Sequence, residues 1–183
     1  MTAIIDEILD LFARFGSGTY GEDLSLERHM LQSAAMAQSL GADDKVIAAA
    51  LLHDIGYFLY AYSEASLNAG RDFAHESLGA TWLSRGFYEA VTAPIALHVS
   101  AKRYLCAVEP GYFDHLSDAS RRSLAVQGGV MTEAEVQAFA RLPAFEAAVI
   151  LRRCDDLGKD VAAPTGGIEH YRGLLESCIR RSS

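Results

Sequence analysis

A histidine and an aspartate stand side by side, His53 and Asp54, directly after an apolar run at positions 46–52. Alanines fill the middle of that run, and alanine is the strongest helix former, so the pair is expected at the end of a buried helix. Burying a carboxylate is unfavourable unless it is paired or binds a metal ion. The two oxygens of Asp54 could then bridge two metals. The alternative is a helix end where Asp54 is solvated and His53 makes one hydrogen bond.

Further candidate ligands are spread over separate predicted helices, and such ligands converge in the middle of a helical bundle. The full set is His29, His53, Asp54, His75, His98 and Asp155. It is too large for one structural zinc ion and holds no thiolate. It suits two iron or manganese ions about 3.5–4 Å apart. Taken singly, His29 could be a core histidine bonded to a backbone carbonyl, and His75 a surface residue. His115 and His170 are also available as ligands, but their polar neighbours predict positions on the surface or around the metal ligands.

In the first half of the chain, apolar residues recur at helical spacing, so helices are expected to position these candidate ligands. Caps and glycines set their ends, with Ser25 and Asp43 or Asp44 as caps and Gly41 and Gly56 as stops. We predict helices over 2–15, 25–40 and up to His53-Asp54, a loop over 57–74, and a helix over 75–85 capped by Asp72.

Helices are also predicted for the second half of the chain. Pro94 should kink or break a helix over 88–105, and residues 109–116 form a turn-rich insert. Ser117 opens a helix to about 127, a capping box at 132–135 starts a short one, and Pro143 suits the first position of another. That helix should run to about 159, and a last one, beyond a break at 164–167, over 168–180. No strand pattern competes, so we predict an all-α fold in one domain, residues 1–183.

Composition narrows the classes of function. The chain has 183 residues and a formal charge of −8, with dispersed basic residues, which argues against nucleic-acid binding. No apolar run is long enough to span a membrane, and the first residues show no signal-peptide pattern. Three widely spaced cysteines, Cys106, Cys154 and Cys178, form neither a disulfide framework nor a zinc motif. A reducing cytoplasm is therefore the expected location.

The order His…His-Asp…His…His…Asp resembles the HD-domain superfamily of metal-dependent phosphohydrolases, and His75 and His98 place the chain with members that hold two metals. Along nearly its whole length the sequence is also similar to HD-domain mixed-valent di-iron oxygenases, which cleave carbon–phosphorus bonds of 1-hydroxyphosphonates. The stretches that carry this likeness are AALLHD at 49–54, HVSAKRYL at 98–105, LSDASR at 116–121, QGG at 127–129, Asp155 with GK at 158–159, and EHYR at 169–172.

The resemblance implies an all-α HD-domain bundle around an Fe(II)/Fe(III) pair, with dioxygen as co-substrate. One iron would take His29, His53, Asp54 and Asp155, and the other Asp54, His75 and His98. Among the catalytic residues, Tyr20 matches a tyrosine that occupies an iron site until substrate arrives. Glu22 matches a glutamate that moves with that tyrosine and meets the substrate amine.

The resemblance also implies a phosphonate site. Lys102, Arg152 and Ser120 match groups that hold the phosphonate, with Ser123 and Gln127 near it; Lys102 is the third residue of the implied catalytic set. Spacing agrees independently, because Lys102 lies four residues after one ligand, His98, and Arg152 three before another, Asp155. One position departs from the family pattern: Tyr57 replaces a histidine that contacts phosphonate.

Aromatic faces hold quaternary ammonium groups, and rings are frequent near the metal pair, at Tyr20, Tyr57, Phe58, Tyr60, Tyr62 and Phe73. We therefore expect (R)-1-hydroxy-2-(trimethylammonio)ethylphosphonate as substrate, giving glycine betaine and phosphate, with the 2-amino relative, giving glycine, still open. The alternative function is an HD phosphohydrolase that acts on a nucleotide or another phosphomonoester. A non-catalytic module of the same fold would lack ligands, and none is missing. A small organophosphonate is the expected partner; no protein partner is implied.

Overall fold

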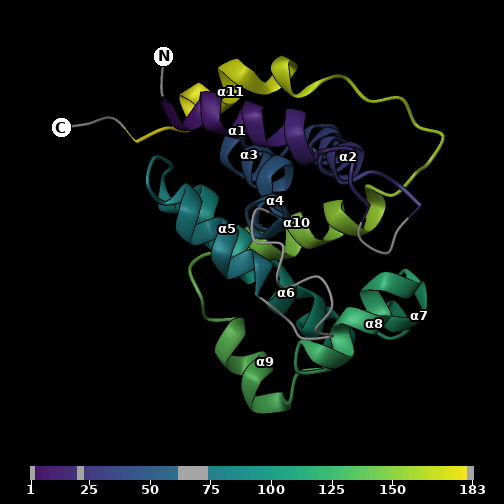
Figure 1. Ribbon diagram of the computed structural model, residues 1–183. Helices are drawn as coiled ribbons and strands as arrows, with labels where there is room; N and C mark the ends of the chain where they lie inside the picture. Colours follow the sequence, from purple (N-terminus) through teal and green to yellow (C-terminus); the bar gives the residue numbers. More distant parts are fainter. Residues whose placement is uncertain (1–2, 20–22, 62–73, 181–183) are drawn as a thin grey trace.

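A computed structural model describes residues 3–19, 23–61 and 74–180, and helices are the main regular elements of these residues (Figure 1). The α-helices are α1 (Ala3–Phe15), α2 (Leu26–Ser39), α3 (Asp44–Leu52), α4 (Ile55–Ala61), α5 (His75–Leu83), α6 (Glu89–Val108), α7 (Tyr112–His115), α8 (Asp118–Val126), α9 (Glu133–Phe139), α10 (Phe145–Leu157) and α11 (Arg172–Ser177). A 3₁₀ turn, η1 (Ile168–Tyr171), precedes α11. The one β-type pairing in these ranges is an isolated bridge between Phe87 and Ile179. The predicted all-α class is confirmed.

Helix α3 lies at the centre, where all residues from Val46 to Leu52 are buried. It packs between α2, α6 and α10, and α6 and α10 also pack against each other. Helix α5 joins the bundle through α4 and α6, while α1 and α11 lie together across one end (Figure 1). The ligand-bearing helices α2, α3, α5, α6 and α10 therefore all meet around the end of α3.

Local sequence explains where several of these helices begin. The side chain of Ser25 accepts a hydrogen bond from the Arg28 amide, and that of Asp43 accepts from the amides of Lys45 and Val46. Each cap satisfies amides that the first helical turn leaves unpaired. The predicted capping box is present, because Thr132 and Glu135 bond to each other's backbone amides at the start of α9.

The predicted stop at Gly56 was wrong, and so was the first part of the predicted loop, residues 57–61; residues 62–73 lie outside the described residues. Gly56 lies inside α4, which continues to Ala61. A Cβ atom at Gly56 would meet the His75 carbonyl oxygen at 2.0 Å, so glycine is needed there for the close approach of α5 rather than to end a helix. The predicted cap Asp72 lies outside the described residues; α5 begins after Ala74, whose φ is +52°.

The predicted break at Pro94 was also wrong, because α6 runs through it to Val108. Proline costs one backbone hydrogen bond, and burial of the helix against α3, α5 and α10 outweighs that loss. Pro143 lies in a turn before α10 rather than at its first position, so the helix begins at Phe145 and ends at Leu157. The last predicted helix divides into η1 and α11 and ends at Ser177, while α7 forms within the predicted turn-rich insert.

Two expectations from composition have counterparts in the structure. None of the described helices is long and apolar enough to cross a membrane. Cys106, Cys154 and Cys178 are all free thiols, as their spacing predicts.

Candidate metal centre

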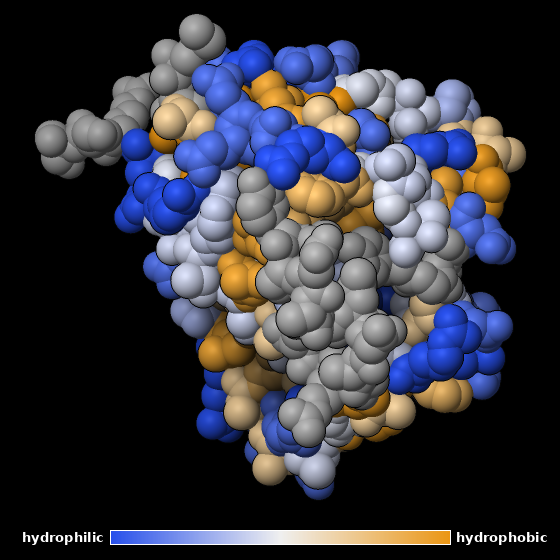
Figure 2. Space-filling view, in the orientation of Figure 1, coloured by the Kyte–Doolittle hydropathy of each residue, from blue (hydrophilic) through white to orange (hydrophobic). Residues whose placement is uncertain are grey.

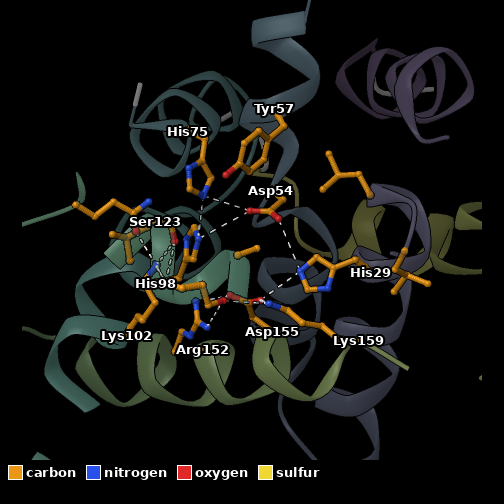
Figure 3. Close-up of a pocket in the computed structure, with 16 residues that line it drawn as sticks. His29, Asp54, Tyr57, His75, His98, Lys102, Ser123, Arg152, Asp155 and Lys159 are labelled. Carbon is orange, nitrogen blue, oxygen red and sulfur yellow. Dashed lines mark hydrogen bonds and ion pairs between the residues drawn. The ribbon is translucent and has the colours of Figure 1, made fainter. Parts of the chain in front are cut away.

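The carboxylate of Asp54 lies between two groups of histidines, in the short link between α3 and α4 (Figure 3). Its Oδ2 is 3.4 Å from His53 Nε2 and 3.7 Å from His29 Nε2. Its Oδ1 is 3.3 Å from His75 Nε2 and 3.9 Å from His98 Nε2. Asp54 is buried, so the alternative of a solvated helix end is wrong. One carboxylate oxygen thus faces each group, as a bridging ligand requires.

The first group joins α2, the end of α3 and α10. His29 Nε2 lies 3.2 Å from His53 Nε2 and 3.2 Å from Asp155 Oδ1. His53 Nε2 lies 4.0 Å from the same Asp155 oxygen. With Asp54, this group offers two imidazole nitrogens and two carboxylates around one point.

The second group joins the first residue of α5 to the middle of α6. His75 Nε2 and His98 Nε2 are 3.1 Å apart, and both face Asp54 Oδ1. Close packing sets this geometry, because Gly56 and Gly79 let α4 and α5 approach backbone to backbone. The group therefore offers two nitrogens and the second oxygen of the bridge.

The contacts of the Nδ1 atoms show that each histidine turns its Nε2 toward the candidate metal position. Nδ1 of His29, His53 and His98 each lies 2.8–2.9 Å from a backbone carbonyl, of Gly158, Ala50 and Ile95 respectively. His75 Nδ1 lies 3.4 Å from Glu76 Oε2. A neutral imidazole that donates through Nδ1 has its lone pair on Nε2, and second-shell bonds of this kind orient metal ligands. Two Nε2 atoms 3.1–3.2 Å apart need a proton or a metal ion between them. The donor set of imidazole nitrogens and carboxylate oxygens fits two metal ions.

Electrostatics keeps both carboxylates ionised. Burial alone would raise the pKa of Asp54, but His53 and His75 hold it well below its usual range. Burial acts in the same way on Asp155, whose pKa Arg152 and Lys159 nonetheless keep well below its usual range. Two negative ligands are thus available to offset the charge of bound cations.

A cavity of about 130 Å³ opens beside the two groups (Figure 3). Five of the six candidate ligands reach it, and α6, α8 and α10 supply most of its remaining wall. The described residues lining it are Leu24, Leu26, His29, Asp54, Tyr57, His75, His98, Val99, Lys102, Ala119, Ser120, Ser123, Gln127, Arg152, Asp155 and Lys159. A small molecule in this cavity would contact the metal ions and three cationic side chains at once.

Lys102 is a buried cation in this wall, with 2% of its surface exposed. Its Nζ donates to Ser123 Oγ at 2.7 Å, to Gln127 Oε1 at 2.6 Å and to the Ser120 carbonyl at 3.5 Å. All three acceptors are neutral. Burial, followed by the nearby charge of Arg152, lowers the pKa of Lys102 to about 8. A buried ammonium that pairs with no carboxylate among the described residues is a site for an anion.

Arg152, unlike Lys102, forms ion pairs with neighbouring carboxylates. It donates to Asp155 Oδ2 at 2.7 Å and to Ser120 Oγ at 3.3 Å, and it pairs with Asp156. Tyr112 adds an acceptor for Arg152 and donates to Asp156. Arg152 therefore connects a metal ligand with the first turn of α8.

Comparison with known proteins agrees with this geometry. The HD domain family model matches residues 26–109, a stretch that contains the four candidate ligand histidines. Hydroxymethylphosphonate dioxygenase of Gimesia maris is 41% identical over 179 residues, 97% of this chain and 89% of the relative. The [1-hydroxy-2-(trimethylamino)ethyl]phosphonate dioxygenase (glycine-betaine-forming) of Leisingera caerulea is 37% identical over 96% of this chain and 90% of the relative.

The chain belongs to the HD-domain oxygenases that cleave carbon–phosphorus bonds. It is an oxygen-using oxidoreductase, and its histidine and aspartate groups indicate that it depends on metal. The predicted resemblance to this family is confirmed.

In this HD-domain oxygenase the fold brings all six predicted ligands together, and the predicted phosphonate residues line the adjoining cavity. Tyr57 also lines it, and its ring stacks on His75 with centroids 4.4 Å apart. Tyr20 and Glu22 lie outside the described residues, as do Tyr62 and Phe73. His115 and His170 are exposed, as predicted.

One predicted aromatic contact was wrong. Phe58 is fully buried and packs edge-on against Phe12, with ring centroids 5.0 Å apart, so it faces the core. Tyr60 is not among the described residues that line the cavity. The cause is the missed helix α4: successive helical residues point about 100° apart, so Tyr57 faces the cavity and Phe58 faces the core.

Sequence reasoning also missed residues of this oxygenase. Lys159 lines the cavity, and Tyr112 and Asp156 hold Arg152. Lys159 lies four residues after the ligand Asp155, just as Lys102 lies four after His98. That repeated spacing was a signal for it, whereas nothing in the local sequence pairs Tyr112 with a residue 44 positions later.

Proposed function

We propose that this enzyme is a di-iron oxygenase that cleaves the carbon–phosphorus bond of a small 1-hydroxyphosphonate. The substrate that we place first is 1-hydroxy-2-(trimethylammonio)ethylphosphonate, with glycine betaine and phosphate as products. One observation carries the proposal: a carboxylate shared by two histidine groups lies beside a buried lysine whose acceptors are all neutral. Two cations and an anion site in one cavity suit a substrate with both a hydroxyl and a phosphonate.

The two metal ions would have different numbers of protein ligands. The first ion would take His29, His53, Asp54 and Asp155, and the second Asp54, His75 and His98. Imidazole and carboxylate donors without thiolate suit iron that reacts with dioxygen. When bound, the two irons supply the redox chemistry through which dioxygen oxidises C1 of the substrate. The second group has fewer protein donors and so leaves more positions for small ligands.

The overall reaction balances without an added reductant. R–CH(OH)–PO₃H₂ and O₂ give R–COOH and H₃PO₄, so both oxygen atoms end in the products. The C–P bond breaks, C1 is oxidised from the alcohol to the carboxylic acid level, and dioxygen is reduced. An oxygenase of this kind therefore consumes one dioxygen for each phosphate.

The chain's own part in this reaction is to bind and orient the phosphonate. We assign the phosphonate oxygens to the Lys102 ammonium, which Ser123 and Gln127 hold at 2.7 and 2.6 Å. Ser120, on the same helix as Ser123, and Arg152, on α10, add further donors. Preorganised donors of this kind also stabilise the negative charge that grows as phosphate leaves. Tyr57, stacked on His75, borders the space for the rest of the substrate.

The roles proposed for Tyr20 and Glu22 rest on the family resemblance. Tyr20 would occupy a metal position until substrate arrives, and Glu22 would meet the substrate's nitrogen end. Leu24 and Leu26, which follow closely in the sequence, line the cavity and support this assignment.

Hydroxymethylphosphonate is the second candidate substrate. The relative that acts on it by name is 41% identical to this chain. Of the three described rings that were expected to hold a trimethylammonium group, Tyr57, Phe58 and Tyr60, only Tyr57 lines the cavity. With this substrate the carbon product would be formate.

The test is phosphate release by the iron-loaded enzyme from the trimethylammonio, amino and hydroxymethyl compounds, in air and without oxygen. We expect release only in air and the highest kcat/KM for the trimethylammonio compound. A clear preference for either other compound would replace the substrate but keep the chemistry. Release of phosphate from phosphomonoesters without oxygen would instead support the phosphohydrolase.

A further inference from the structure

The cationic side chains of the cavity are not equally able to balance the charge of a bound anion. The protein is acidic overall, with a net charge of −8 and three lysines, Lys45, Lys102 and Lys159. Two of these three lysines line the one cavity beside the metal ligands. The inference below rests on the proposed function, since it concerns the phosphonate of that substrate.

Arg152, the third cation, is already matched by acids. It lies 2.7 Å from Asp155 and also pairs with Asp156. Two carboxylates around one guanidinium leave little net charge to attract an anion. A phosphonate dianion needs more than the single charge of Lys102 to balance it.

Lys159 lies where that second charge is needed. Its Nζ is 3.1 Å from Ser120 Oγ and 3.3 Å from Ser117 Oγ, at the N-terminal turn of α8. Lys102 reaches the Ser120 carbonyl at 3.5 Å. Figure 3 shows the two lysines on opposite sides of Arg152 and Asp155. The two ammonium groups thus approach Ser120 from different segments, Lys102 from α6 and Lys159 from the turn after α10.

The backbone holds Lys159 in this place. The carbonyl of Gly158 accepts from His29 Nδ1, and a Cβ atom at Gly158 would meet Ser33 Oγ at 2.5 Å. On the other side, Asp160 bonds through its amide and carbonyl to the Gln32 side chain. The turn after α10 is therefore fixed against α2, and Lys159 is directed inward with 18% of its side chain exposed.

We propose that Lys159 binds the phosphonate of the substrate, and the phosphate product, together with Lys102. Its ammonium also lies 3.7 Å from Asp155 Oδ1, the oxygen that faces His29, so that it links the bound anion to the first metal group. Two lysine charges match a phosphonate dianion, and this pocket selects dianions over singly charged carboxylates and sulfonates.

The first test measures inorganic phosphate binding to the iron-loaded enzyme by calorimetry. Lys159→Gln should weaken binding about tenfold or more, as expected for the loss of a charge-assisted hydrogen bond. Lys159→Arg should restore it to within about threefold, because it keeps the charge. Lys45→Gln, at an exposed position on α3, is the matched control and should bind like the wild type. In turnover, Lys159→Gln should raise KM more than it lowers kcat.

Two results would overturn the proposal. One is phosphate binding by Lys159→Gln within about twofold of the wild type. The other is loss of iron from that variant, which would mean that Lys159 supports Asp155 rather than the anion. Neither result bears on the oxygen dependence of the wild-type enzyme, which tests the proposed function separately.

A second measurement uses the unaltered enzyme and does not depend on the folding of a variant. Lysine acetylation is followed at each of the three lysines by mass spectrometry, with and without inorganic phosphate. Phosphate should slow the acetylation of Lys159 and leave that of Lys45 unchanged. Equal rates at Lys159 with and without phosphate would contradict the assignment.

Discussion

The charge of Lys102 should give the enzyme a falling activity at alkaline pH. Burial, followed by the charge of Arg152, lowers the pKa of this lysine from 10.5 to about 8. The ammonium form, to which we assign the phosphonate, is present below that pH and is lost as the pH rises through it. Because kcat/KM reports groups of the free enzyme, it should follow the charged fraction of Lys102.

The size of the effect follows from the pKa. With a pKa of about 8, roughly three quarters of the enzyme carries the Lys102 charge at pH 7.5 and about a tenth at pH 9. If the neutral amine binds phosphonate poorly, kcat/KM should fall about eightfold over this range. The KM should rise by more than kcat falls, since bound phosphonate favours the charged form.

The assay is initial phosphate release in air at fixed iron concentration from pH 7.5 to 9.5. Lys102→Arg is the comparison, because a guanidinium stays charged over this range. The arginine variant should lose the alkaline decline, even if its activity is lower at every pH. A wild-type profile that stays flat to pH 9.5, or an equal decline in Lys102→Arg, would refute this account of the lysine.

Three further predictions concern the metal groups. His75→Ala should lower bound iron from two to about one per chain and abolish oxygenase activity while the helical circular dichroism is retained; full activity would contradict the two-metal assignment. Gly56→Ala should lower the free energy of unfolding by about 2–4 kcal/mol in denaturant titrations, because its Cβ would overlap the His75 carbonyl; Gly173→Ala, with open space around it, should not. Iron at about 100 times its dissociation constant should raise the melting temperature by about 5–10 °C over chelated protein, and an unchanged melting temperature would argue against the site.

The two groups of candidate ligands were predictable because histidine and aspartate are themselves typical metal ligands. Histidines and aspartates on separate helices rarely face a core without a reason, and their order matches a family. The bundle itself followed from apolar periodicity and from caps such as Ser25 and Thr132. These features depend on neighbours in the sequence, which is why they could be predicted without coordinates.

The failures came from contacts between distant segments. Gly56 signals a helix end by local rules, but its actual role is to let the backbone of His75 approach. Pro94 costs a hydrogen bond locally, yet packing on three sides keeps α6 continuous. The placement of Lys159 depends on Gly158 and Gln32, which are more than 120 residues apart. Only the folded chain brings such residues together.

The central claim is oxidative cleavage of the carbon–phosphorus bond, and the stoichiometry of dioxygen to phosphate tests it most directly. The iron-loaded enzyme is supplied with a 1-hydroxyphosphonate in a closed oxygen-electrode cell, and released phosphate is measured in the same sample. The account predicts one dioxygen consumed for each phosphate and no release after oxygen is exhausted. Continued phosphate release without oxygen would contradict it.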